Sequence, residues 1–453
     1  MKKKLENRKN NKSIIVSTLI FVITFIAMAG YLIYFNLTQA ESIINNSYNK
    51  RQGVLSRRTI RGSILSDDKT KLAVTNVDGD GNETRYYPYS GLFSHTIGYL
   101  NNGGYGLESL YGYYMLHSNQ NFFEQIGNDL SGNRNTGDNV VTTLNVGLQK
   151  ACYDALGSNR GAVIVMEPST GKILAMVSKP DFDPNTLAAN WSQITGEGSD
   201  SVLVNRATQG LYPPGSTFKL ITMLEYLREH KNDYGQYHYI CDGTYELGNN
   251  TINCVRTTAH GDVDLFSSLA VSCNCSFINI GLSLDLDRYK KTAEKMLFNK
   301  ELPTNLEYNK SRFVLNGESS EWDIAQTSFG QGKTVITPFH LALITCTIAN
   351  NGTLMEPYLV SSVESTNGMT VKKFKEEKYD TLITEKEASL LKKGMEQVVK
   401  DSFSWLFGGV EYTLAAKSGS AQYGTEGYEH SLYASFSPAD NPEIAVVAVG
   451  GGG

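Results

Sequence analysis

The sequence of 453 residues lacks several features that would assign it to a class of protein directly. It contains no internal repeat and no long low-complexity segment, which excludes a repeat array and a chain that is disordered throughout. It also has no excess of basic residues, because 41 Lys and Arg are outnumbered by 46 Asp and Glu, for a formal net charge of −5. This charge argues against a nucleic-acid partner.

Cysteine and histidine are both scarce. Neither the number nor the spacing of the six cysteines describes a disulfide scaffold or a zinc site, and the seven histidines show no ligand spacing, so we expect no metal and no cofactor. Cys241 and Cys254 flank a segment typical of a hairpin and could pair as a disulfide, an alternative that the sequence leaves open. Cys273 and Cys275 are expected to be small core residues, and His260 is expected to be structural.

One long hydrophobic run is present, close to the N-terminus. Residues 1–12 carry six basic side chains and one acidic side chain, and the uncharged run Ile14–Phe35 that follows is long enough to span a bilayer. The basic flank predicts that the N-terminus stays in the cytoplasm. We therefore expect a cytoplasmic tail over 1–12 and a single transmembrane helix over 13–36, with the rest of the chain outside the cell membrane. A cleaved signal peptide is the alternative, but the run is too long and no clear cleavage site follows it.

The remainder of the chain is long enough for two or three domains. Residues 37–140 include Tyr-, Gly- and Asn-rich stretches and predict a mixed, loop-rich juxtamembrane module that acts as a non-catalytic pedestal. Residues 141–453 then form the catalytic domain, and a strand near Thr142 followed by a helix is expected to open it.

Three short motifs carry the chemistry, and the first is Ser-x-x-Lys from Ser216 to Lys219. Two prolines and a glycine end any preceding element, and an apolar pattern of helical spacing follows, so Ser216 is predicted at a helix N-terminus. Lys219 lies one turn further on, within reach of the serine hydroxyl. Such a serine is an activated nucleophile if the lysine is neutral, which burial and a second cation, Lys417, would favour. The alternative is a capping serine beside a solvated lysine.

The second motif, Ser-x-Asn, interrupts an apolar stretch with Ser272 and Asn274. The Ser272 hydroxyl can donate and accept, which suits the passage of a proton between a lysine and a leaving amine. The Asn274 amide can hold a peptide group of a substrate. The alternative is a turn between two helices that uses both residues as caps.

The third motif begins at Lys417 and predicts a short edge strand along which a substrate could lie as an added strand. Gly419 removes a side chain where something must approach the backbone closely. The hydroxyls of Ser418 and Ser420, together with Lys417, suit a carboxylate. The alternative is a solvent-facing lysine that protects an edge strand from aggregation.

In this order the three motifs resemble those of the penicillin-binding proteins, specifically the class B peptidoglycan transpeptidases, which have a membrane anchor and no glycosyltransferase domain. Residues 160–178 resemble the family's first sheet hairpin, 330–352 its helical side, and 61–67 and 105–109 its non-catalytic module, so the resemblance covers nearly the whole ectodomain. It implies an α+β fold, in which an antiparallel sheet with helices on both faces is joined by an all-helical subdomain, a transmembrane helix and a smaller mixed juxtamembrane module.

The resemblance also implies a role for each motif residue. The reacting groups would be the nucleophile Ser216, its base Lys219, and the proton relay of Ser272 and Lys417. The substrate-binding groups would be Asn274 and, around Gly419, the hydroxyls of Ser418 and Ser420 on the terminal carboxylate. Backbone N–H groups of Ser216 and Ser420 would form the oxyanion hole.

The implied activity is that of a D,D-transpeptidase that cross-links peptidoglycan stem peptides. Ser216 would attack the penultimate D-alanine of a donor stem, the terminal D-alanine would leave, and an acceptor amine would resolve the acyl-enzyme. β-Lactams would mimic the donor and remain attached, and a polytopic glycosyltransferase would be a partner. A D,D-carboxypeptidase or β-lactamase-like hydrolase and a non-catalytic β-lactam receptor or cell-wall scaffold are the alternatives.

Two features depart from the family's pattern. Ser418 stands where the family usually has threonine, which preserves the hydroxyl. The sequence ends in a run of glycines where the family continues into a final helix on the sheet, and an uncovered sheet face would expose apolar surface, so we expect a truncated sequence.

Overall fold

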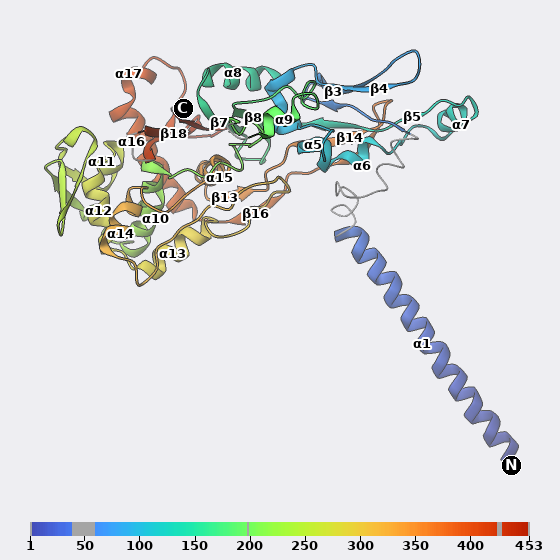
Figure 1. Cartoon of the computed structure of the whole chain (residues 1–453). Helices are drawn as coiled ribbons and strands as arrows, with labels where there is room; N and C mark the ends of the chain where they lie inside the picture. The colour runs from blue at the N-terminus through green and yellow to red at the C-terminus, as the bar shows by residue number, and fades with distance from the viewer. Residues whose placement is uncertain (1, 39–58, 197–198, 424–427, 452–453) are drawn as a thin grey trace.

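The computed structural model describes residues 2–38, 59–196, 199–423 and 428–451 (Figure 1). The first element, α1 (Lys2–Thr38), is a long rod that stands clear of the remainder. Its apolar part, Ile14–Phe35, is not buried against the rest of the described chain. These 22 residues rise about 33 Å as a helix, close to the thickness of a bilayer's hydrocarbon core. By length and composition, α1 is therefore able to cross a membrane once.

A five-stranded antiparallel sheet forms the centre of the catalytic part, in the order β17-β18-β19-β7-β8. Its strands are β7 (Arg160–Met166), β8 (Ile173–Lys179), β17 (Ala415–Tyr423), β18 (Tyr428–Ser437) and β19 (Ile444–Gly451). The hairpin expected over 160–178 is confirmed as β7 and β8. β17, which carries the Lys-Ser-Gly motif, lies at one edge of the sheet, so one side of its backbone is free of strand pairing.

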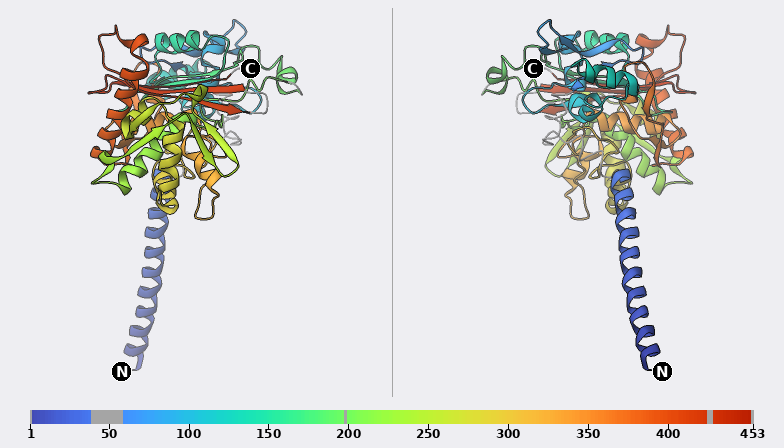
Figure 2. Two further views of the ribbon diagram at one scale, coloured as in Figure 1. Left: turned by 90° about the vertical axis from the view of Figure 1, so that its left-hand side faces the viewer. Right: turned by 90° about the vertical axis from the view of Figure 1, so that its right-hand side faces the viewer.

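Helices cover both faces of this sheet, as predicted (Figure 2). Successive residues of a strand point to opposite faces. Val163 and Val165 accordingly pack with α8 (Val146–Leu156), whereas Ile164 belongs to the main core on the other face. That second face is covered by α15 (Pro338–Ala349) and α16 (Glu385–Ser402).

A mostly helical subdomain lies beside the sheet (Figure 1). Its helical elements are η2 (Gly215–Phe218), α10 (Lys219–Glu229), η3 (Tyr234–Gln236), η4 (Val255–Thr257), α11 (Leu265–Ala270), α12 (Asn274–Ser283), α13 (Leu286–Lys295) and α14 (Glu321–Ser328). It also contains two small antiparallel sheets, formed by β9 (His238–Cys241) with β12 (Gly261–Asp264) and by β10 (Thr244–Leu247) with β11 (Asn250–Asn253). The hairpin expected between Cys241 and Cys254 is thus present as β10 and β11.

A second sheet, six-stranded and mixed, has the order β15-β14-β6-β2-β3-β4. Its strands are β2 (Ile64–Leu65), β3 (Lys71–Val77), β4 (Glu83–Tyr86), β6 (Asn139–Thr142), β14 (Val360–Glu364) and β15 (Thr370–Lys373). The strand expected near Thr142 is β6, but it pairs here and not in the catalytic sheet. The sheet therefore joins strands from both sides of residue 140.

Shorter elements complete the described chain. They are β1 (Thr59–Ile60) with β5 (Asn135–Thr136), β13 (Thr353–Met355) with β16 (Lys378–Thr381), η1 (Ser90–Phe93), α4 (Ser94–Ile97), α5 (Gly106–Leu110), α6 (Gly112–Met115), α7 (Phe122–Leu130), α9 (Trp191–Thr195) and α17 (Ser404–Phe407).

A buried ion network joins residues 61–67 and 105–109, the two juxtamembrane segments that resemble the family. Arg61 Nε lies 2.8 Å from one carboxylate oxygen of Glu108, and Arg85 Nε lies 2.7 Å from the other. Burial opposes the charge on Glu108, but the two guanidinium groups outweigh it and lower the pKa of the carboxyl group. Arg61 and Glu108 therefore tie the start of the module to α5.

Candidate active site

The three sequence motifs meet in one cleft of about 1030 Å³. The predicted residues that line it are Ser216, Ser272, Asn274, Ser418, Gly419 and Ser420. Lys219 and Lys417 are buried beneath them, with 0% and 1% of their surface exposed. The structure thus brings together all eight residues singled out from the sequence, although they come from η2 and α10, the turn between α11 and α12, and the edge strand β17.

Ser216 stands at the start of a helical run, as predicted, but the first turn is a 3₁₀ turn and the α-helix begins only at Lys219. Gly215, immediately before Ser216, adopts a positive φ of 54°. Its N–H donates to the carbonyl oxygen of Gly330 at 2.8 Å, and a Cβ on Gly330 would lie only 1.7 Å from the Gly215 carbonyl oxygen. The Gly-Gln-Gly segment at 330–332 therefore holds the turn that presents the serine.

Lys219 extends towards the turn of the second motif. Its Nζ donates to the carbonyl oxygen of Ser272 at 2.7 Å, to Asn274 Oδ1 at 2.8 Å and to Ser272 Oγ at 3.2 Å. Among the residues that the structure describes, Ser216 Oγ is not a hydrogen-bond partner of this amine. Hydrogen bonds that serve catalysis are often made only once substrate is bound, so this arrangement is compatible with a base beside Ser216.

Lys417 reaches the same serine from β17. Its Nζ donates to Ser272 Oγ at 3.0 Å and to the carbonyl oxygen of Ser418 at 2.8 Å. Ser272 itself adopts a positive φ of 55°, which is uncommon outside glycine and asparagine. The hydroxyl of Ser272 therefore lies between two lysine side chains on a strained turn.

Burial alters the proton affinity of both lysines. It lowers the pKa of Lys219 to about 7. Burial, and after it repulsion from Lys219, holds the pKa of Lys417 well below its usual range. Burial thus lowers the pKa of Lys219, as predicted. Repulsion between the two lysines, however, lowers the pKa of Lys417 and not that of Lys219. At neutral pH this pair includes a neutral amine that is able to accept a proton.

The edge of β17 lies against the turn that carries Ser216. A Cβ on Gly419 would lie 3.1 Å from the backbone nitrogens of Ser216 and Thr217 and 3.0 Å from the Pro214 carbonyl oxygen. The expectation that Gly419 permits a close approach is therefore correct, and the approaching group is the backbone of η2 itself.

The free edge of β17 also exposes the peptide groups of Ser420. The carbonyl oxygen of Ser420 accepts from Gln331 Nε2 at 3.3 Å, away from the neighbouring strand β18. The N–H and C=O of one residue in an antiparallel strand point to the same side. The N–H of Ser420 therefore faces the cleft beside Gly215 and Ser216.

Several cleft residues had no signal in the sequence. They are residues 251–256 at the end of β11 and the start of η4, of which only Cys254 was singled out before and not as a cleft residue, Trp322, Gln326 and Phe329 from the α14 region, and the paired residues Gln422 and Glu429 of β17 and β18. Gln331 belonged to a segment that resembles the family, which was its only signal. Arg256 adopts a positive φ of 57° in η4, and no local pattern marks it as part of a site.

The cysteines beside the site lie closer together than their spacing suggested. Cys273 and Cys275 are fully buried, as expected. Cys241 Sγ and Cys254 Sγ face each other at 3.8 Å as free thiols. Cys254 Sγ also lies 3.8 Å from Cys273 Sγ and 3.4 Å from Cys275 Sγ. The four side chains form a single cluster behind the second motif.

Known proteins share this fold and this sequence pattern. The peptidoglycan D,D-transpeptidase PbpA of Mycolicibacterium smegmatis is 30% identical over 419 residues, which are 86% of this chain and 83% of the relative. The imipenem acyl-enzyme complex of penicillin-binding protein A from M. tuberculosis superposes with a TM-score of 0.79 at 29% identity, over 87% of this chain and 94% of that one. The D,D-transpeptidase domain of a peptidoglycan glycosyltransferase from Eggerthella lenta superposes with a TM-score of 0.77 at 29% identity, over 86% and 93%.

Two family models match separate parts of the chain. Residues 61–140 match the penicillin binding protein A dimerisation domain. Residues 161–450, which contain all three motifs, match the penicillin binding protein transpeptidase domain. The chain belongs to the penicillin-binding proteins of the peptidoglycan D,D-transpeptidase family.

Proposed function

We propose that this D,D-transpeptidase cross-links peptidoglycan stem peptides through an acyl-enzyme on Ser216, and that β-lactams acylate the same hydroxyl. The observation that carries the proposal is the convergence of Lys219 and Lys417 on Ser272, at the cleft where η2 presents Ser216. A buried amine with a pKa of about 7 beside a serine at a helix start is the combination that nucleophilic acyl transfer needs.

In the acylation step, Ser216 Oγ attacks the carbonyl carbon of the penultimate D-alanine in the donor stem. Its proton passes to the neutral amine of Lys219, which turns from the Ser272 turn towards Ser216 when substrate is bound. The bond to the terminal D-alanine then breaks, and the leaving nitrogen must gain a proton. Ser272 can pass it on, because its hydroxyl touches both lysine amines and can donate as well as accept.

The negative charge that develops on the carbonyl oxygen is stabilised by backbone donors. The N–H of Ser216 at the start of η2 and the N–H of Ser420 on the free edge of β17 form this oxyanion hole. The hydroxyls of Ser418 and Ser420 bind the terminal carboxylate, close to the amine of Lys417. Asn274 holds a peptide group of the donor, once Lys219 has released its amide oxygen.

The acyl-enzyme is resolved by an amine of a neighbouring stem. Glu429, on β18, is the one carboxylate among the described residues that line the cleft. A hydrolase that depends on a carboxylate to activate water would need such a group beside Ser216, whereas Glu429 stands opposite Gln422, beyond the third motif on β17. The cleft therefore favours transfer to an amine over a dedicated hydrolytic reaction.

The membrane arrangement that we propose follows the charge around α1. Residues 1–12 remain in the cytoplasm, 13–36 cross the bilayer, 37–140 act as a pedestal, and 141–453 form the catalytic domain on the outer side. A polytopic glycosyltransferase would bind the anchor and pedestal. Protease added to intact protoplasts should then remove the catalytic domain and leave a fragment of about 40 residues, whereas protection of the catalytic domain would refute this orientation.

The chemistry is tested with the full chain in detergent and a fluorescent penicillin. We expect covalent label on the peptide that contains Ser216, and none in Ser216→Ala, because that variant lacks the hydroxyl that forms the acyl bond. The variant should still fold, since no side chain caps the start of η2. Ser192→Ala, on the exposed helix α9, is the control that should label normally. Label on any other serine would refute the assignment. With lipid-linked peptidoglycan as substrate, the product should be a cross-linked dimer of stems, and release of D-alanine without cross-links would identify a carboxypeptidase instead.

A further inference from the structure

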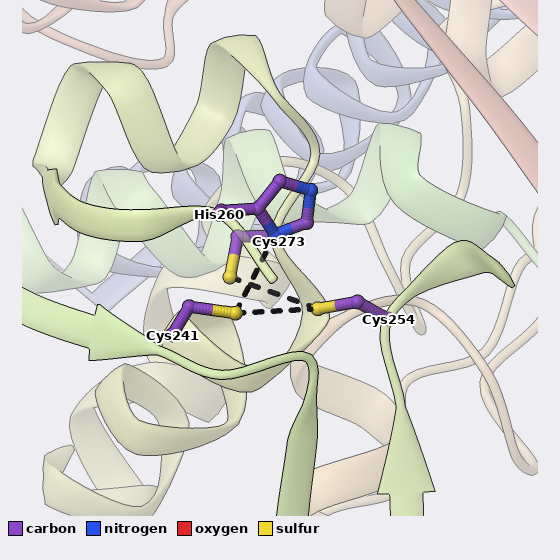
Figure 3. Close-up of side chains that lie close together, drawn as sticks. All are labelled: Cys241, Cys254, His260 and Cys273. Carbon is purple, nitrogen blue, oxygen red and sulfur yellow. Dashed lines mark hydrogen bonds between the residues drawn. The ribbon is translucent and has the colours of Figure 1, made fainter. Parts of the chain in front are cut away.

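Three thiols and one imidazole converge directly behind the active-site turn (Figure 3). Cys241 ends β9, Cys254 follows β11, His260 precedes β12, and Cys273 lies between α11 and α12. The donor atoms of these four residues all lie within 4.8 Å of one another. Apart from His260, which is partly exposed, the group is buried.

We propose that Cys241, Cys254, His260 and Cys273 bind one zinc ion. Zinc takes cysteine sulfur at about 2.3 Å and histidine nitrogen at about 2.0–2.1 Å in tetrahedral structural sites, so two bound sulfurs lie about 3.8 Å apart and a sulfur and a nitrogen about 3.6 Å apart.

Three of the six separations between donor atoms match these edges of a tetrahedron, and all six lie within 4.8 Å. Cys254 Sγ lies 3.8 Å from Cys241 Sγ and 3.8 Å from Cys273 Sγ. His260 Nδ1 lies 3.5 Å from Cys241 Sγ. Three cysteines and one histidine form a complete ligand set for a closed structural site, which leaves no position for substrate.

The fold brings the four ligands together, although no sequence motif predicts the site. β9 pairs with β12 so that Cys241 stands opposite Gly261, which places His260 beside it. The β10–β11 hairpin returns the chain to Cys254. Successive ligands are separated by 12, 5 and 12 residues, without the close pair of cysteines that is typical of a zinc finger. The spacing alone therefore describes no zinc motif, and this proposal departs from the expectation that the chain binds no metal.

The surroundings suit thiolate ligands better than a disulfide. The backbone N–H of Ser276, in the first turn of α12, donates to Cys273 Sγ at 3.4 Å, an outer contact that stabilises a metal-bound sulfur. Cys254 touches the sulfurs of three other cysteines, including Cys275 at 3.4 Å. A disulfide could use only one of these neighbours, whereas a zinc ion satisfies three thiolates at once.

The position of the site gives the metal a function in the known reaction. Cys273 lies between Ser272 and Asn274, and Cys254 belongs to the wall of the cleft that residues 251–256 form. Asn274 Nδ2 already donates to the carbonyl oxygen of Asn253 at 3.0 Å. A zinc ion would bind that wall to the strained Ser272 turn, so the ligands act as positioning residues that fix the hydroxyl between the two lysines.

The test measures metal in the full chain, purified in detergent without chelator, reductant or added metal. We expect about one zinc per chain by mass spectrometry of the metal, as a single closed site requires. Cys254→Ser and His260→Gln should lose most of it, whereas His260→Cys restores a ligand and should retain zinc. Cys152→Ser, a buried cysteine on α8 outside the cluster, is the matched control and should keep the full content. Zinc absent from the wild-type protein, or unchanged in Cys254→Ser, would overturn the proposal.

Two further measurements separate a metal site from oxidised or merely packed thiols. Replacement of zinc by Co²⁺ should give the visible bands of a tetrahedral thiolate site, and thiol titration of the denatured protein with chelator should find all six cysteines. Fewer thiols would show a disulfide and refute the site. Removal of zinc should slow acylation by one β-lactam in protein that still melts cooperatively, and zinc chloride alone should restore the rate. An unchanged acylation rate would refute the positioning role.

Discussion

Lys219 and Lys417 approach the same oxygen atom, since their Nζ atoms lie 3.2 and 3.0 Å from Ser272 Oγ. Both side chains are buried, and two ammonium groups so close together would repel each other with little water to screen them. The pair therefore carries less than two positive charges at neutral pH. The site therefore provides a neutral lysine amine as a base and needs no carboxylate or histidine for this role.

Lys219→Arg should slow acylation by a β-lactam by at least about 100-fold, the usual contribution of a general base. The guanidinium remains protonated at every working pH and cannot accept the serine proton. The measurement is the second-order acylation rate, on protein checked by thermal melting. Lys291→Arg, on the exposed side of α13, is the matched control and should react normally. Near wild-type acylation of Lys219→Arg would show that the proton leaves Ser216 by another route.

The acylation rate should also decrease at acidic pH. Lys219 accepts the proton only when it is neutral, and its pKa is lowered by burial to about 7. The rate should therefore fall as the pH decreases through this value, by about tenfold per unit well below it, and level off above it. Stopped-flow acylation by one β-lactam across this range, with thermal melts at each pH, tests the sign. A rate that is flat, or that rises towards acid, would contradict a neutral Lys219.

Gly419→Ala should impair acylation without unfolding the protein. The added Cβ would lie 3.0–3.1 Å from backbone atoms of η2, so β17 must move away from Ser216. Displacement of the oxyanion donors by a few tenths of an ångström should cost about 10- to 100-fold in acylation rate. Gly450→Ala in β19 of the same sheet has no neighbour within 4 Å of the new Cβ and is the control. Equal rates for both variants would show that the spacing of β17 and η2 is not critical.

Glu108→Gln should destabilise the module of the six-stranded sheet by about 3–5 kcal/mol, because it leaves two buried guanidinium groups without a counter-charge. The carboxylate of Glu108 is fully buried between Arg61 and Arg85. The expected result is a lower melting temperature by calorimetry, with an unchanged acylation rate in protein that remains folded. Asp154→Asn removes the exposed pair with Lys150 and should cost no more than about 1 kcal/mol. Similar melting temperatures for the two variants would contradict the role of the network.

The sequence by itself determined the features that depend on local chain chemistry. The apolar run of α1, the helical start at Ser216, the hairpin of β7 and β8 and the edge strand at Lys417 each follow from the order of neighbouring residues, and the three motifs identified the family. Local sequence patterns did not predict every local feature, however. They could not reveal that a 3₁₀ turn precedes α10, or that the strand near Thr142 joins the six-stranded sheet.

Only the tertiary structure decided which atoms meet across long stretches of chain. Lys417 and Ser272 are 145 residues apart, and Arg61 and Glu108 are 47 apart, so no local pattern links them. The same holds for the cysteine and histidine cluster, whose ligands are brought together by strand pairing and a helix turn. A contact between distant segments depends on how the whole core packs, and the burial that lowers the pKa of Lys219 exists only once that packing is complete.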